Sequence, residues 1–254
     1  GQIAGVRFIR PLPPLAGGFQ RLTLGIDYKD FDESIALTGN QPSIETPIDY
    51  GILTAGWGLT FAGERRTTEL NLLGVVGPRF LGNDADEFAS KRAGAKPSFA
   101  YAGLSLAHEQ ELWARTRLRL EVSAQAADSP LISNEQFAFG GADSVRGYLE
   151  SQQFVDDGMY AQLEFLSPDW GEGLPGFSSG RAFAFLDAGA GRLQDPLPEQ
   201  SYRFLLWSTG VGLRAALWRR LTAEIEWAVP LRDSDDDSVL AGDSRWHFNT
   251  RFAF

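Results

Sequence analysis

The segment Leu221-Thr222-Ala223-Glu224-Ile225-Glu226-Trp227-Ala228-Val229 alternates apolar and polar side chains with a period of two. This period predicts a β-strand whose two faces meet different surroundings. The apolar face runs for about nine residues, which is the length that a tilted strand needs to cross a bilayer. The polar face carries full charges, which suit a water-filled interior. The segment therefore favours a strand of a transmembrane β-barrel.

The same alternation recurs along the chain and predicts eleven strands. They cover residues 4–11, 19–29, 50–61, 67–78, 98–109, 115–127, 158–167, 181–191, 202–217, 221–231 and 245–254. Several apolar faces end in Trp, Tyr or Phe, as the interfacial girdles of outer-membrane barrels do. A soluble sandwich with its polar faces in solvent is the alternative explanation. We predict an all-β fold, an antiparallel transmembrane β-barrel.

Composition excludes several classes of protein. The chain has 254 residues, 43% hydrophobic and 22% charged, and no apolar run of roughly 18 residues, so a helical membrane protein is excluded. The absence of cysteine excludes disulfides and thiolate metal sites. A net charge of −10 argues against nucleic-acid binding. No signal peptide is recognisable and residue 1 is Gly, so we expect a processed or trimmed N-terminus.

The predicted connections alternate in length, which predicts orientation. The long ones cover residues 33–49, 81–98, 129–158, 194–201 and 233–243. Outer-membrane barrels have short periplasmic turns and long outer loops, so we expect extracellular long loops and a periplasmic C-terminus. Single-chain bacterial barrels have even strand numbers. Either one strand is missed and the barrel is small and complete, or the chain begins inside a larger barrel; we favour the second.

The longest connection contains Gly140-Gly141-Ala142-Asp143-Ser144-Val145-Arg146-Gly147-Tyr148, with one cation. A carboxylate that matches Arg146 follows at Asp187, on the predicted inward face that also carries Phe183 and Phe185. A charge-assisted pair between them would pin the loop inside the barrel. If that pair is only partly buried, it adds about 0–1 kcal/mol. The alternative is a solvated loop cation beside a solvated lumen carboxylate.

Several short motifs carry a family resemblance. The sixth extracellular loop and the following strand of the BamA/TpsB superfamily of outer-membrane polypeptide transporters and insertases resemble four successive runs of this chain: Phe137-Ala138-Phe139-Gly140-Gly141, Ser144-Val145-Arg146-Gly147-Tyr148, Asp157-Gly158 and Leu163-Glu164. Phe185, Asp187 and Gly189 resemble its second signature, and Phe254 its terminal assembly signal. Within the superfamily, the chain is more similar to two-partner secretion transporters (TpsB type). The residues that carry this finer likeness are Asp157-Gly158, Pro11-Leu12-Pro13 and Gly25-Ile26-Asp27-Tyr28-Lys29.

The resemblance implies a fold, a location and partners. Residues 1–254 would be the C-terminal part of a sixteen-stranded barrel, with loop 129–158 folded into the lumen and the polypeptide-transport-associated (POTRA) domains absent from this chain. The protein would export an unfolded partner polypeptide across the outer membrane of a Gram-negative bacterium (hemolysin activation/secretion). It would contact the bilayer and lipopolysaccharide, and the barrel-assembly machinery during biogenesis. An assembly insertase and a passive porin or receptor are the alternatives; two POTRA domains upstream would favour secretion, and five the insertase.

The same resemblance implies two sets of functional residues. The lock between loop and lumen wall comprises Val145, Arg146, Gly147, Tyr148, Phe185, Asp187 and Gly189. The C-terminal assembly signal comprises Trp246, Phe248, Phe252 and Phe254, which we expect to face lipid while His247, Asn249 and Arg251 face the lumen.

Chemistry beyond transport has little support in the sequence. The two histidines, His108 and His247, are too far apart to suggest a metal site, and the acidic residues between 233 and 237 suit a solvated loop better than a Ca²⁺ site. No Ser, His and Asp constellation is recognisable. We therefore expect no catalytic residue, metal or cofactor, and a protein that is not an enzyme.

Overall fold

The computed structural model describes residues 1–254 except 33, 36–43, 46, 172, 219 and 254. Its main feature is an antiparallel sheet of eleven strands in which each strand pairs with its neighbours along the chain. The strands are β1 (Gln2–Leu15), β2 (Gly18–Phe31), β5 (Ile48–Ala62), β6 (Arg66–Gly77), β7 (Phe99–Glu111), β8 (Arg117–Ala127), β11 (Asp157–Leu166), β12 (Phe177–Arg192), β13 (Arg203–Leu217), β14 (Leu221–Pro230) and β15 (Arg245–Phe252). The predicted all-β antiparallel fold and its eleven strands are confirmed.

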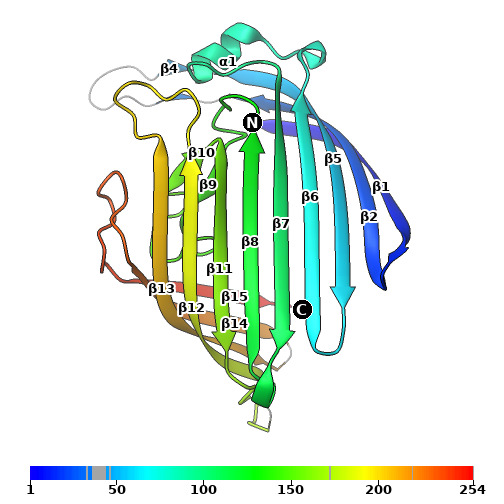
Figure 1. The fold of residues 1–254 in the computed structure, drawn as a ribbon, viewed down its shortest axis with the longest axis vertical. Coiled ribbons are helices and arrows are strands. Elements are labelled where there is room, and N and C mark those ends of the chain that lie inside the picture. Colours follow the sequence, from blue (N-terminus) through cyan, green and yellow to red (C-terminus); the bar gives the residue numbers. More distant parts are fainter. Residues whose placement is uncertain (33, 36–43, 46, 172, 219, 254) are drawn as a thin grey trace.

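Small elements occupy the connections at one end of the sheet (Figure 1). They are β3 (Ser34–Ile35), β4 (Ile44–Glu45), the 3₁₀ turn η1 (Arg79–Leu81) and helix α1 (Ala85–Lys91). The long loop 128–156 contains a hairpin of β9 (Phe137–Phe139) and β10 (Gln153–Val155), and the turn η2 (Trp113–Arg115) lies at the opposite end. No helix among the described residues has the length and hydropathy to cross a membrane.

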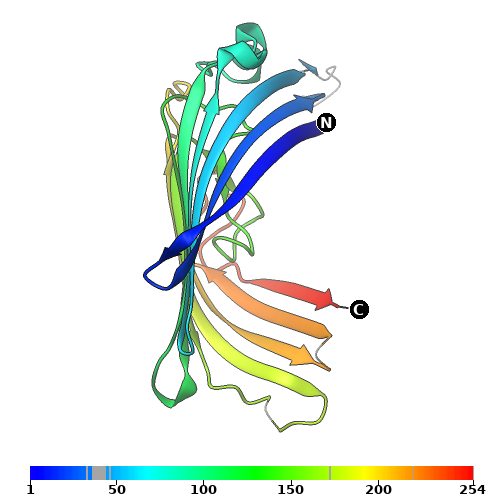
Figure 2. The same cartoon turned by 90° about the vertical axis from the view of Figure 1, so that its right-hand side faces the viewer.

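Figure 2 shows the sheet curled, with the edges at β1 and β15 turned to the same side and loop 128–156 inside the curve. Each of these two strands has one neighbour in the described sheet. The curvature follows from the right-handed twist that accumulates from strand to strand. The sheet therefore has a convex face and a concave face that holds the loop.

The alternation of side chains matches these two faces. On β12, Phe185 and Asp187 are 4% and 0% exposed on the concave side, whereas Leu186 between them is 42% exposed on the convex side. Exposed apolar side chains also cover the outside of β13. This convex face is apolar, as the outer wall of a barrel in lipid must be.

The strand boundaries differ from the sequence prediction by more than two residues in two strands. β1 ends at Leu15 rather than at residue 11, because Pro13 and Pro14 are tolerated in a strand with one pairing neighbour, where a missing N–H breaks no ladder bond. β12 begins at Phe177 rather than at residue 181, and its register shifts between Phe177 and Ser179. The polar residues and glycine in this stretch conceal the start of the strand from a search for alternation. Helix α1 and the β9–β10 hairpin were not predicted.

Candidate functional site

The tip of loop 128–156 is shaped by its glycines. Gly140, Gly141 and Gly147 have φ angles of +111°, +98° and +90°, which L side chains rarely adopt. The Ser144 hydroxyl accepts from the Gly140 amide at 2.8 Å, and the Gly141 amide donates to the Val145 carbonyl at 3.1 Å. These bonds fold the tip into a compact turn that points Arg146 at the sheet.

Arg146 is 2% exposed and binds three carboxylates from three strands. Its Nε and Nη2 atoms each lie 2.7 Å from an oxygen of Asp187 on β12, in a bidentate pair. Its Nη1 atom lies 2.7 Å from both Glu164 on β11 and Glu226 on β14. The guanidinium carbon lies 3.6 Å from the centre of the Phe185 ring. The loop tip is thus fixed to β11, β12 and β14 at once.

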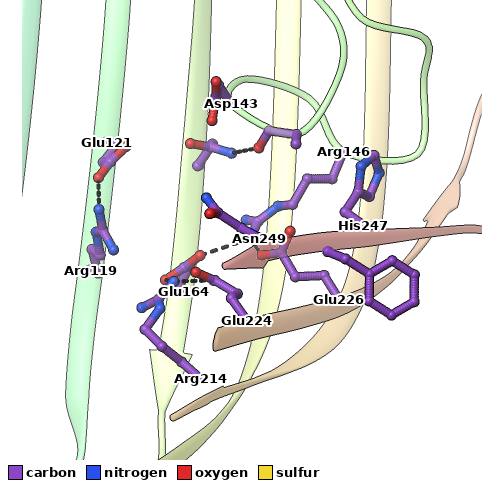
Figure 3. A pocket seen from close by; sticks show the side chains of 13 residues that line it. Arg119, Glu121, Asp143, Arg146, Glu164, Arg214, Glu224, Glu226, His247 and Asn249 are labelled. Atoms are coloured by element: carbon purple, nitrogen blue, oxygen red, sulfur yellow. Dashed lines mark hydrogen bonds and ion pairs between the residues drawn. The ribbon is translucent and has the colours of Figure 1, made fainter. Parts of the chain in front are cut away.

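The cluster around Arg146 has more negative than positive charge. Arg214 adds a second guanidinium, 2.5 Å from Glu224 and 3.5 Å from Oε2 of Glu164. Two guanidinium groups therefore face four carboxylates, an excess of two negative charges. Figure 3 shows the two guanidinium groups with Glu164, Glu224 and Glu226, all of which line a cavity together with Asn249 and His247 of β15. The cavity has a volume of about 450 Å³.

Tyr148 and Gly147 fix the end of the motif. The Tyr148 hydroxyl lies 2.7 Å from the Arg232 carbonyl and 2.9 Å from that of Trp207, and donates its proton between them. Burial raises the pKa of this phenol, which keeps it a donor. The Gly147 amide lies 3.2 Å from Nε2 of His247, which accepts its hydrogen bond. His247, expected from the sequence only to face the lumen, thus joins the last strand to the loop.

Glycine on β12 lets the loop approach the sheet. A Cβ atom at Gly189 would lie 2.6 Å from Phe139 and 2.9 Å from Val145, both of which are buried. No side chain fits into such a gap without displacing the loop. The structure therefore brings together all seven residues of the predicted lock, whose role stays a prediction.

A second set of polar contacts, which was not predicted from the sequence, holds the base of the loop. Glu135 accepts from Lys29 Nζ and from the Tyr50 and Tyr101 hydroxyls at 2.5, 2.5 and 2.8 Å. Nearby, Arg92 makes a bidentate pair with Asp156 at 2.5 and 2.7 Å. These pairs join residues up to 106 positions apart, so only the fold brings them together.

The predicted assembly signal lies on the convex side of β15. Trp246, Phe248 and Phe252 are 60%, 71% and 60% exposed, and Phe254 lies outside the described residues. His247 and Asn249 line the cavity at the loop tip, which Phe248 also borders. The strand period directs residues 247 and 249 to the face opposite residues 246, 248 and 252. The role of the aromatic residues in assembly remains a prediction.

Metal binding finds no support in this site. Across the part of the chain that the structure describes, no three His, Cys, Asp or Glu side chains are placed to hold a metal ion. Arg146 and Arg214 occupy the positions between the carboxylates.

A curled antiparallel sheet with an apolar outside, and a loop tied by an arginine to its polar inside, defines a protein of the transmembrane β-barrel class. A comparison with protein families identifies which one: residues 50–215 match the family of haemolysin secretion/activation proteins ShlB/FhaC/HecB, and the chain belongs to this family. The matched residues contain both Arg146 and Asp187. The predicted membership of the two-partner secretion transporters is confirmed. The comparison with curated proteins gave no match.

Solved structures support the barrel fold. CdiB from Escherichia coli matches 99% of this chain with a TM-score of 0.76 at 20% identity, and CdiB from Acinetobacter baumannii matches 99% with a TM-score of 0.68 at 16% identity. The chain covers 45% and 42% of these two structures, less than half of their length.

Proposed function

We propose that this chain forms the C-terminal part of an outer-membrane pore that exports an unfolded partner polypeptide. The family membership of residues 50–215 supports this function. The observation that carries it is the buried ion cluster of Arg146, which holds a long loop against a polar concave wall. A pore that passes a polypeptide needs such a wall, together with an element that occupies the space while no substrate is present.

The concave wall suits a substrate without a fixed sequence. Its charges are largely paired along or between strands, as in Arg7–Asp27 at 2.6 Å, Arg117–Glu109 at 2.5 Å and the contact of Arg119 with Glu121. Such a wall is polar but presents little uncompensated charge away from the Arg146 cluster. An extended polypeptide can form and exchange hydrogen bonds with this wall and with the water inside the lumen. Such a wall does not select substrates by their charge pattern.

The proposed topology follows from the loop lengths. The long connections, including 128–156 and 193–202, face the cell exterior, and the C-terminus faces the periplasm. Residues 1–254 are all barrel, loop 128–156 fills part of the lumen, and the family's POTRA domains lie outside these residues. The convex face contacts the bilayer and lipopolysaccharide, and the barrel-assembly machinery inserts the chain. The protein carries out transport without catalysis.

The test is partner secretion by the full-length transporter carrying Arg146→Ala, Asp187→Ala or both. Because the two side chains form one contact, the double variant should secrete no less than the single ones. Barrel amount in the outer membrane is measured in parallel. Arg117→Ala is the matched control, since its pair with Glu109 is more than one third exposed. Normal secretion by both single variants, with the barrel intact, would refute the proposed role of the loop.

A further inference from the structure

A hollow lies on the convex face of the sheet, near the ends of β11, β12 and β13 that adjoin the long connections. Figure 1 shows these strand ends side by side. It has a volume of about 620 Å³. Its apolar wall is formed by Ala124, Met159, Ala190 and Leu205, which are aligned in register across four neighbouring strands. Two alanines between larger side chains leave the space that makes the hollow.

Three arginines line the same hollow. Arg192 and Arg203 lie directly opposite each other on β12 and β13. They are the next outward-facing residues after Ala190 and Leu205, about 7 Å farther along the strands. Arg232, from the connection after β14, completes the set. The chain as a whole carries a net charge of −10, so three cations at one site are a departure from its general character.

The arrangement of these arginines is unfavourable without an anion. Like charges directly opposite on neighbouring strands destabilise a sheet. The single carboxylate lining the hollow, Asp157, accepts from Arg192 Nε at 2.8 Å but also from the Ala127 amide at 2.8 Å and the Gln194 side chain at 3.1 Å. Arg192 gives Asp157 one of the five N–H groups of its guanidinium. The lining of the hollow therefore has a formal excess of two positive charges, and Asp235, which is not part of the lining, interacts electrostatically with Arg232.

Aromatic packing keeps one of these cations at the rim. The Arg203 guanidinium carbon lies 5.1 Å from the centre of the Tyr202 ring, which is within the range of a cation–π contact. Arg192 remains 65% exposed beside it. The guanidinium groups thus lie where the convex face changes from apolar to polar, which is the depth of lipid phosphates.

We propose that this hollow binds a phosphorylated glycolipid of the lipid A type, with an acyl chain against Met159, Ala190 and Leu205 and a phosphate between Arg192, Arg203 and Arg232. Guanidinium groups bind phosphate oxygens in pairs, and basic residues at a membrane surface select anionic headgroups. The inference rests on the proposed orientation, which places this rim in the outer leaflet. The proposal assigns a defined lipid to one site on the convex face. Part of this site lies on β12, the strand that carries Asp187 on its concave side.

The test is binding of bisphosphorylated lipid A to the purified full-length transporter in detergent micelles, measured by native mass spectrometry. We expect Arg192→Gln/Arg203→Gln to weaken binding about tenfold or more, and removal of both phosphates from the lipid to do the same. The matched control is Arg66→Gln/Arg220→Gln, two exposed arginines at the short turns, which should change binding less than twofold. Arg203→Gln alone, which keeps the Arg192–Asp157 pair, should show a partial loss.

Four results would overturn the inference: equal binding of the dephosphorylated lipid, equal loss in the control variant, equal binding of phosphatidylglycerol, or displacement of lipid A by an equimolar amount of inorganic phosphate. Either of the first two results would show that the arginines do not bind the lipid phosphates. The third would show that the site does not select a glycolipid, and the fourth that the acyl chain contributes nothing to binding. The assay involves no export. If the transporter secretes its partner but does not bind lipid A, only the lipid site is refuted. If it binds lipid A but does not secrete its partner, only the proposed export function is refuted.

Discussion

The charge imbalance around Arg146 predicts that neighbouring substitutions have unequal effects. Arg146→Gln leaves Asp187, Glu164 and Glu226 buried with their shared cation removed. Loss of one partner of a buried ion pair costs about 3–5 kcal/mol. Glu226→Gln instead removes one of two excess negative charges, and its amide oxygen can still accept from Arg146. That change should alter the free energy of loop opening by less than about 1.5 kcal/mol.

Hydrogen–deuterium exchange of residues 140–150 in the full-length transporter measures this opening directly. A cost of about 3–5 kcal/mol corresponds to exchange that is roughly a hundredfold faster or more, since each 1.36 kcal/mol is a factor of ten. The sequence alone suggested a small cost for a partly buried pair, and the burial of Arg146 changes that expectation.

The control is Arg117→Gln, which breaks a pair whose side chains are 37% and 35% exposed. Exposed pairs contribute about 0–1 kcal/mol, so exchange at the loop tip should stay close to that of the unmodified protein. If Arg146→Gln opens the tip no more than this control does, the cluster does not hold the loop. If Glu226→Gln opens it as much as Arg146→Gln does, the argument from excess negative charge fails.

Three further predictions concern other parts of the chain. Phe248→Arg on the convex side of β15 should reduce barrel yield far more than Asn249→Arg on the concave side. The reason is that an arginine facing lipid near the bilayer midplane costs roughly 2–4 kcal/mol of folding free energy. Equal yields of heat-modifiable barrel would contradict this prediction. Glu135→Ala removes the common acceptor of three donors and should destabilise the base of the loop by about 1–3 kcal/mol, visible as faster hydrogen exchange in residues 129–136. Burial alone would raise the pKa of Asp169, but hydrogen bonds from Ser179 and two backbone amides outweigh it and lower the pKa below 3.8. A lowered pKa stabilises the folded state above the unfolded value, so the turn 167–176 should become more sensitive to protease as the pH falls below about 4, and Asp169→Asn should abolish this dependence.

Each of these predictions has its own reference. For Phe248→Arg, the control is Asn249→Arg, one residue away on the same strand. For Glu135, Glu111→Ala removes an acid from a pair with Arg65 whose side chain is 67% exposed, and should leave exchange unchanged. For the turn, a protease sensitivity that rises in the same way in Asp169→Asn as the pH falls would show that another group is responsible.

Alternation of side chains identified the eleven strands of the main sheet, but it missed four residues at the end of β1, four at the start of β12, and the β9–β10 hairpin. β14 and β15, for example, expose Trp227 and Phe248 on one side, as a period of two requires. This works because successive side chains of a strand point to opposite faces, so a local pattern fixes which residues share a face. The sequence also paired Arg146 with Asp187 as a prediction. Charge sign and order along the chain left that pairing open, and the resemblance of the two motifs to a known family favoured it.

Only the tertiary structure decided which other groups meet Arg146. Glu164 belonged to a motif of the family resemblance but was not predicted to contact Arg146, and Glu226 looks like any other inward carboxylate in its strand. β14 reaches the loop tip because the sheet curls. The same holds for Glu135, whose partner Lys29 lies 106 residues away. Contacts of this kind depend on strand order, register and curvature. A pattern with a period of two carries no information about these long-range relations, and only the folded sheet sets them.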